Sequence, residues 1–224
     1  SFLLKADQGF ALPLEEIEKK LLPHSLIYLG HPNNPDGQML SPSDFEAVLR
    51  LAKKKESFLI IDESFIDFVG DDVSYRHVLV NETCGAVVMS LTKFYAVPGL
   101  RIGAAYLHPA LAERLQDTLI PWNVNGLAQS YMTAAAQDID YIRNSRVYCQ
   151  AEREKLSATL DALDFLKVLP GSVNFILCQL IGRYQTAEEL QEVLMPYHIL
   201  IRRCGNYEGL DETYFRVAVR TEEE

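Results

Sequence analysis

The sequence predicts an α/β fold with a mostly parallel sheet covered by helices, followed by a smaller α/β unit. Short apolar segments alternate with amphipathic segments through the first half of the chain. The apolar segments are nearly continuous in β-forming residues, as in strands that are buried within a parallel sheet. Strand–helix alternation of this kind is typical of a sheet with helices on both faces.

Each element of the first part has its own local signal. The helix after the first predicted strand begins at Ser41, a suitable N-cap, with Pro42 at the first helical position and Asp44 at capping-box spacing. A second helical stretch follows the Gly-Asp-Asp turn at residues 70–72, and a third begins near Pro109. The predicted strands are residues 25–29, 57–62, 86–91 and 101–107.

The second part begins with a long amphipathic helical stretch at residues 127–163. A later helix opens with a capping box formed by Thr186 and Glu189. The predicted strands of this part are residues 173–180, 199–203 and 214–220. We therefore expect residues 1–130 to belong to a large domain and residues 131–224 to form a small C-terminal domain.

Composition excludes several classes of function. The 224 residues are 48% hydrophobic and 23% charged, and the net charge of −10 gives no general attraction to nucleic acid or anionic membranes. No apolar stretch approaches the ~20 residues that span a bilayer. The four cysteines are widely spaced without a C-x-x-C pair, which favours a reducing cytoplasm. They are Cys84, Cys149, Cys178 and Cys204.

Polar residues follow three of the predicted strands directly. The first strand is followed by H-P-N-N-P-D-G at residues 31–37, the second ends at Asp62, and the third runs into S-L-T-K at residues 90–93. Alone, each is ordinary turn, cap or surface chemistry. Ligands of open parallel sheets bind beyond the carboxyl ends of the strands, so together these residues predict a binding site.

These motifs have a known counterpart. P-N-N-P-x-G, D-E-x-[FY] and S-x-x-K, with Arg101 eight residues after Lys93 and a late Arg216, resemble the fold-type-I pyridoxal-phosphate enzymes of the aminotransferase superfamily. The resemblance extends over essentially the whole chain. It implies that Lys93 forms the Schiff base with the cofactor aldehyde and that Asp62 pairs with the pyridine nitrogen. Asn34 would hydrogen-bond the phenolic oxygen O3′ and lie beside the substrate.

The resemblance also assigns Ser90 and Arg101 to the cofactor phosphate. Physical chemistry agrees with these roles, because a carboxylate beside the ring nitrogen keeps it protonated and strengthens the electron sink. A lysine near a cationic group loses affinity for its proton and becomes a nucleophile. The guanidinium fork of arginine suits a phosphate dianion.

Within this superfamily, P-G-L-R-I-G, P-W-N-V-N and N-F-I-L resemble the branch that holds histidinol-phosphate aminotransferase and threonine-phosphate decarboxylase. Pro98, Trp122, Phe65 and Arg220 favour the decarboxylase. The expected reaction is decarboxylation of L-threonine O-3-phosphate to (R)-1-aminopropan-2-yl phosphate in cobalamin biosynthesis. The alternative is transamination of histidinol phosphate. A non-catalytic cofactor-binding domain is a third interpretation, against which the joint presence of all the site residues counts.

The same comparison implies residues that hold the substrate. Arg216 would grip a carboxylate and Arg202 the distal anion. Arg220, four residues after Arg216, is expected on the same strand face. Arg203 is expected to form a surface ion pair. Roles for Asn174 and His31 stay open, and the other histidines are expected at surface or capping positions: His24, His77, His108 and His198.

The first thirty residues contain neither the glycine-rich phosphate loop nor the ring-stacking aromatic residue of this superfamily. We therefore expect the sequence to be the later part of a longer protein. The resemblance further implies a cytoplasmic homodimer that acts on a small phosphorylated amino acid and binds neither nucleic acid nor membrane.

Overall fold

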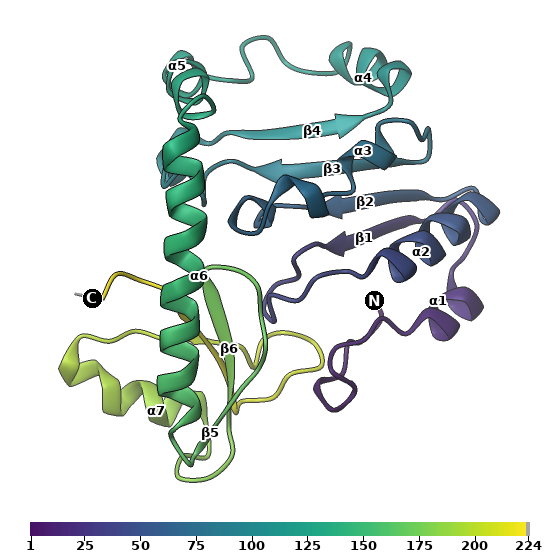
Figure 1. Ribbon diagram of the computed structural model, residues 1–224. Helices are drawn as coiled ribbons and strands as arrows, with labels where there is room; N and C mark the ends of the chain where they lie inside the picture. Colours follow the sequence, from purple (N-terminus) through teal and green to yellow (C-terminus); the bar gives the residue numbers. More distant parts are fainter. Residues whose placement is uncertain (223–224) are drawn as a thin grey trace. The chain divides into compact units, whose positions relative to one another are not determined.

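The computed structural model describes residues 1–222, which contain two four-stranded sheets (Figure 1). Each sheet lies in its own compact unit. The parallel-sheet unit comprises residues 20–32 and 40–146. The antiparallel-sheet unit comprises residues 1–19, residues 33–39 and the chain from residue 147 onward. The prediction of a domain boundary at residue 130 stays a prediction.

The parallel-sheet unit has the expected mostly parallel sheet, with strand order β1-β2-β3-β4. Three strands are parallel: β1 (Leu26–Gly30), β2 (Phe58–Asp62) and β3 (Gly85–Ser90). The fourth, β4 (Gly103–Leu107), pairs antiparallel with β3. Its helices are α2 (Pro42–Lys54), α3 (Arg76–Leu79), α4 (Pro109–Gln116), α5 (Gly126–Ala135) and the first part of α6 (Ile139–Asp161).

One face of this sheet packs into a core. Leu59, Ile61 and Val87 point to that face and are fully buried, and α2 contributes an apolar side to the core. On β1, however, Leu26 is 64% and Tyr28 is 56% exposed. Ile27 between them is buried, so exposed and buried residues alternate along β1 with the two-residue period of a strand.

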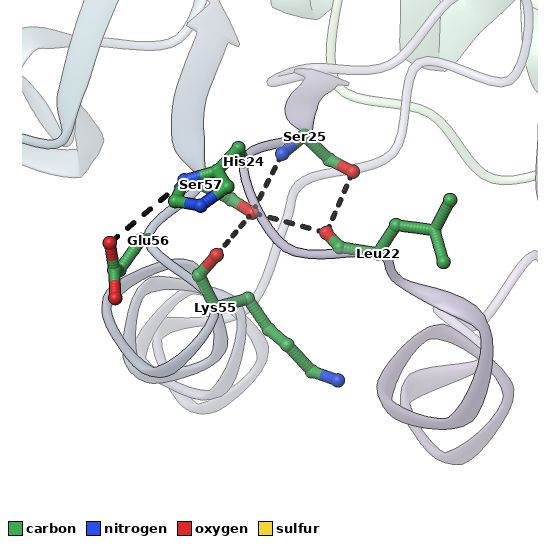
Figure 2. Close-up of polar contacts among 6 residues, drawn as sticks. All are labelled: Leu22, His24, Ser25, Lys55, Glu56 and Ser57. Atoms are coloured by element: carbon green, nitrogen blue, oxygen red, sulfur yellow. Dashed lines mark hydrogen bonds and ion pairs between the residues drawn. The ribbon is translucent and has the colours of Figure 1, made fainter.

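The amino ends of β1 and β2 are tied together by one buried hydroxyl (Figure 2). Ser57 Oγ accepts a hydrogen bond from the Ser25 amide at 3.0 Å and lies 3.2 Å from the Lys55 carbonyl oxygen. Ser25 Oγ in turn donates to the Leu22 carbonyl at 2.8 Å. At the surface, His24 and Glu56 form an ion pair across the same turn when the histidine is protonated. These bonds set where the two strands begin.

The antiparallel-sheet unit is built on strand order β5-β6-β8-β7. Its strands are β5 (Leu166–Val168), β6 (Phe175–Leu180), β7 (Arg202–Arg203) and β8 (Tyr214–Ala218). All neighbouring strands pair antiparallel. The unit also contains most of α1 (Leu14–Lys20), the rest of α6, and α7 (Ala187–Leu194), whose N-cap Thr186 accepts from the Glu189 amide as the capping box predicts. Residues of β6, β8 and α7 share one apolar core.

Several predicted boundaries differ from the structure. The helical stretch 127–163 is broken between α5 and α6, because Asp138 turns the chain and caps the Tyr141 amide. The last strand ends at Ala218, so Arg220 lies beyond it and does not share a strand face with Arg216. No helix in residues 1–222 is long and apolar enough to cross a membrane.

Candidate active site

The carboxyl ends of β2 and β3 bring together polar residues of the parallel-sheet unit. Asp62 ends β2, and its carboxylate is held by three donors. The Tyr28 hydroxyl donates to Oδ2, while the Ser64 amide, at 2.9 Å, and the Ser64 hydroxyl donate to Oδ1. Burial, together with the bond to Asp62, raises the pKa of Tyr28 to about 12, so the phenol keeps its proton. The carboxylate therefore has a fixed orientation at the edge of the sheet.

Lys93 follows β3 in a tight turn. The turn is closed by a bond from the Val97 amide to the Thr92 carbonyl at 3.0 Å, and the ammonium lies 5.3 Å from the centre of the Phe65 ring. Burial lowers the pKa of Lys93, as does Arg101, while Asp62 opposes the shift by raising it. The amine is therefore more readily deprotonated than an ordinary surface lysine, which favours nucleophilic chemistry.

Hydroxyl and guanidinium donors accompany Lys93. Ser90 Oγ and Thr92 Oγ1 share a hydrogen bond of 2.8 Å. Arg101 has a left-handed backbone with φ of 52°, and its Nη1 donates to the Pro98 carbonyl at 2.9 Å. The side chain of Arg101 is otherwise exposed. These groups are suited to hold an anion with several oxygen atoms.

A second cluster lies in the antiparallel-sheet unit, around Asn34. Arg216, on β8, donates from Nη1 to Asn34 Oδ1, and the Tyr207 hydroxyl lies 3.4 Å from the same oxygen. The Arg216 guanidinium also stacks 4.4 Å above the centre of the Phe175 ring, an arrangement that stabilises a cation. Since Oδ1 is the acceptor for both donors, the NH₂ group of Asn34 points elsewhere as a hydrogen-bond donor.

Arg202 lies directly opposite Arg216 in the register of β7 and β8. Its guanidinium donates to the Arg203 carbonyl at 2.8 Å and to Asn206 Oδ1 at 3.1 Å, and it lies 5.7 Å from the centre of the Tyr207 ring. Opposed residues on antiparallel strands share a face, so the two guanidinium groups belong to one side of this sheet. Arg203 instead pairs with Glu188 at 2.5 Å, which confirms the expected surface ion pair.

The structure adds contacts that the motifs did not reveal. Tyr28, Tyr207 and Phe175 each touch a predicted site residue, yet tyrosines and phenylalanines are so common that none stands out in one sequence. Asn174 has a buried side-chain oxygen with no hydrogen-bond partner among the described residues.

Two of the remaining predictions concern histidines. His108 Nδ1 accepts from the Ala110 amide and caps α4, as expected for a capping histidine. His31, whose role was left open, is almost completely buried.

The predicted residues thus form two groups. Asp62, Ser90, Lys93 and Arg101 belong to the parallel-sheet unit, and Asn34, Arg202 and Arg216 belong to the antiparallel-sheet unit. Comparison with known proteins shows that residues 1–224 match the model of the aminotransferase class I and II family. The chain belongs to this family. Its members depend on pyridoxal phosphate.

Three relatives illustrate the similarity of this aminotransferase-family chain. The adenosylcobalamin biosynthesis bifunctional protein CobDQ of Leptospira interrogans is 37% identical over 99% of the chain and 26% of its own length. The threonine-phosphate decarboxylase of Salmonella typhimurium is 36% identical over 87% of the chain and 53% of its own length. The crystal structure of histidinol-phosphate aminotransferase from Clostridium acetobutylicum is 31% identical, with a TM-score of 0.89, over 97% of the chain and 65% of that protein. The chain thus spans less than two thirds of each relative.

Proposed function

We propose that the protein containing this chain uses pyridoxal phosphate to decarboxylate L-threonine O-3-phosphate to (R)-1-aminopropan-2-yl phosphate, a step of cobalamin biosynthesis. The observation that carries this proposal is the pair of arginines on β7 and β8. Arg202 and Arg216 are opposed in register on one face, where they offer two separate cationic groups. Threonine phosphate has two anionic ends, a carboxylate and a phosphate, that require such a pair.

The donors in the parallel-sheet unit fit pyridoxal phosphate. Lys93 offers an amine with a lowered pKa for the aldehyde, and Asp62 offers an oriented carboxylate for the ring nitrogen. Ser90 and Arg101 offer a hydroxyl and a guanidinium for the phosphate. When bound, pyridoxal phosphate supplies an electron-withdrawing ring that stabilises negative charge at the substrate α-carbon.

The protein's own residues then have defined tasks. Lys93 would hold the cofactor through its aldehyde, and its amine would carry a proton to the substrate α-carbon. Asp62 would keep a proton on the ring nitrogen, and the Asn34 NH₂ group would donate to the phenolic oxygen. Arg216, which contacts Asn34 and Phe175, would bind the carboxylate, and Arg202 would bind the phosphate. The two arginines together would orient the substrate.

Two of the three relatives described above support this choice by name, one as a threonine-phosphate decarboxylase and one as a cobalamin biosynthesis protein. A second candidate is histidinol-phosphate aminotransferase, which the 0.89 TM-score to the Clostridium acetobutylicum enzyme favours. Histidinol phosphate has a phosphate but no carboxylate. Histidinol phosphate itself would therefore need only one of the two arginines, although the 2-oxo acid acceptor of a transamination would bring a carboxylate of its own.

The deciding experiment incubates the full-length protein, loaded with pyridoxal phosphate, with L-threonine O-3-phosphate. Release of carbon dioxide without a 2-oxo acid acceptor is the expected result. Amine exchange that requires an acceptor, with histidinol phosphate as the better substrate, would replace the decarboxylase by the aminotransferase. The homodimer stays a prediction, which light scattering on the full-length protein tests.

A further inference from the structure

His31 directly follows β1, and its ring is 1% exposed. Ring atom Nδ1 accepts a hydrogen bond from the Leu40 amide at 3.0 Å, and Nε2 lies 2.9 Å from the Val73 carbonyl oxygen. A backbone amide can only donate and a carbonyl can only accept, so Nε2 carries the hydrogen and Nδ1 carries none. Both bonds exist together only when the imidazole is neutral.

The bond between the Leu40 amide and His31 Nδ1 joins the two ends of a loop, and we call this pair of residues the neck of the loop. Between His31 and Leu40 the chain runs through residues 33–39, which include Asn34. Inside the loop, the Asn33 amide donates to the Gln38 carbonyl at 2.8 Å. The Asp36 carboxylate accepts from Asn33 Nδ2 and from the Gln38 amide, each at 2.9 Å. The loop is therefore closed twice, once internally and once at its neck.

The neck is also held from outside by the segment around Tyr75. The Tyr75 hydroxyl donates to the Leu40 carbonyl at 2.7 Å, and its ring lies 4.6 Å from the His31 ring and stacks on Phe45. Glu63 fixes this segment by accepting from Ser74 Oγ and from the Tyr75 amide. Leu40 is thus bonded through both its amide and its carbonyl, and only the amide bond depends on an imidazole, which can gain a proton.

We propose that His31 is a positioning residue for Asn34, and that protonation of its ring opens the neck of the loop. The inference rests on the proposed function only in the role given to Asn34. The neutral ring holds the chain on either side of residues 33–39 at a fixed separation. A protonated Nδ1 cannot accept from Leu40, so the partly buried amide would be left without its partner, which is unfavourable.

The charges around His31 set the direction of the pH effect. Burial lowers the pKa of His31, against a smaller opposing effect of the bond to Val73. On the segments packed against the ring, Tyr75 stays neutral because its pKa is raised to about 12. The pKa of Glu63 is raised by burial, and Arg76, one residue further on, pairs with Asp71.

Three carboxyl groups complete this set: Asp62, Asp44 and Glu46. The Asp62 carbonyl accepts from the His31 amide, and its carboxylate is bonded to Tyr28. Asp44 and Glu46, on α2, raise the pKa of Tyr75. With its own pKa lowered, His31 is neutral and the neck closed at neutral pH. The neck opens only as the pH falls through that lowered pKa.

The test uses two substitutions that separate the two ring bonds. In His31→Asn, Oδ1 occupies the position of Nδ1, accepts from Leu40 and cannot titrate. In His31→Gln, the longer side chain reaches the position of Nε2 and leaves the Leu40 amide without an acceptor. His77→Asn, at an exposed position of α3, is the matched control.

Hydrogen exchange of the Leu40 amide in the full-length protein is the first measurement, and it requires neither cofactor nor substrate. Relative to wild type, exchange corrected for its intrinsic pH dependence should be about tenfold faster in His31→Gln and unchanged in His31→Asn. Acid should accelerate it in wild type but not in His31→Asn. The proposal would be overturned if the Leu40 amide exchanged equally fast in His31→Gln and His31→Asn. It would also be overturned if acid accelerated this exchange equally in wild type and in His31→Asn.

The second measurement is the affinity for pyridoxal phosphate, followed by fluorescence titration. His31→Gln should weaken binding about tenfold when Asn34 is present and have no effect in an Asn34→Ala background, because residues that act through one another are non-additive. An equal effect in both backgrounds would show that His31 does not act through Asn34. If even the wild-type full-length protein failed to bind the cofactor, the proposed function would be lost, while the exchange data would still decide whether His31 closes the neck.

Discussion

Opposing charges act on the Lys93 amine. Arg101 favours the neutral amine and Asp62 favours the ammonium, while burial adds to the effect of Arg101. The S-x-x-K motif alone identified the lysine, but the sizes of these influences depend on three-dimensional separation. The motif therefore predicts which lysine to test, whereas the lowering of its pKa depends on the folded structure.

Because Arg101 and Asp62 shift the pKa of Lys93 in opposite directions, replacing each should move that pKa in opposite directions. Arg101→Gln should raise the pKa of Lys93, and Asp62→Asn should lower it further. The measurement is the pH dependence of covalent attachment of pyridoxal, which lacks the phosphate that Arg101 is proposed to bind. Attachment requires the neutral amine, so the acid limb should move to higher pH in the first variant and to lower pH in the second. Shifts of the same sign in both variants would contradict the arrangement.

Lys93 should also be the point of covalent attachment. We expect borohydride reduction of the full-length protein with pyridoxal phosphate to label the peptide that contains Lys93. Lys93→Ala should lose the label, and Lys155→Ala, which removes an exposed lysine paired with Glu152, should retain it. Mass spectrometry of the digested protein checks this, and a label on another peptide would remove Lys93 from its proposed role.

At the scale of the elements, the pairing of β7 with β8 places Arg202 opposite Arg216. Arg202 and Arg216 are fourteen positions apart in sequence, and the antiparallel register places them opposite each other. The strands were predicted, but β7 is two residues long instead of five, and Arg220 falls outside β8. Strand ends are poorly marked in a single sequence because hydrogen-bond pairing, which sequence does not display, decides them.

The proposed roles of Arg202 and Arg216 predict that replacing either one weakens the use of threonine phosphate. Arg216→Ala and Arg202→Ala should each lower kcat/KM for threonine phosphate by about 30- to 1,000-fold, because each removes one charge-assisted contact. Arg203→Ala is the control, since it removes an exposed guanidinium paired with Glu188. Comparing phosphorylated and unphosphorylated threonine across the three variants checks the assignment. If the preference for the phosphorylated compound survived in both site variants, a two-anion pocket would be excluded.

The hydrogen bond between Ser57 and Ser25 at the amino ends of β1 and β2 should contribute to stability, so its removal should lower the free energy of unfolding. Ser57→Ala removes the buried oxygen that accepts from Ser25 and leaves that amide without its partner (Figure 2). The cost should be about 1–3 kcal/mol in the free energy of unfolding. Urea denaturation of the full-length protein measures it. Ser130→Ala, at an exposed position on α5, should change stability by less than about 0.5 kcal/mol.

At the scale of the whole molecule, each compact unit is made of segments that are separated in the sequence. The mostly parallel sheet and the later strands followed from patterns of local hydrophobicity. Local patterns did not predict which segments belong to one unit. Residues 1–19 and 33–39 group with the chain from residue 147 onward, because this grouping depends on contacts between residues far apart in sequence. Asn34 shows the effect, since it lies only four residues after β1 in the sequence but belongs to the same unit as Arg216, to which it is bonded.

The helix α6 runs through the point where the chain passes from one unit to the other, between Arg146 and Val147. Val147 is exposed, so its side chain adds little to packing. Val147→Pro should nevertheless lower the free energy of unfolding by about 3 kcal/mol, because proline removes a helical hydrogen bond and clashes with the preceding turn. Val147→Ala should be nearly neutral. Chemical denaturation of both variants checks the difference, and equal stabilities would show that an uninterrupted helix is unimportant here.

The shortness of β7 has an evolutionary consequence. Arg202 sits on a two-residue strand at the rim of its sheet, whereas Arg216 lies on the interior strand β8. Mutations and small insertions are tolerated better at such a rim than inside a sheet. If Arg202 binds the far end of the substrate as proposed, that contact can change by mutation at β7 while the interior strand that carries Arg216 is left intact. Altered substrate preference is therefore expected from substitutions at β7 more readily than from substitutions on β8.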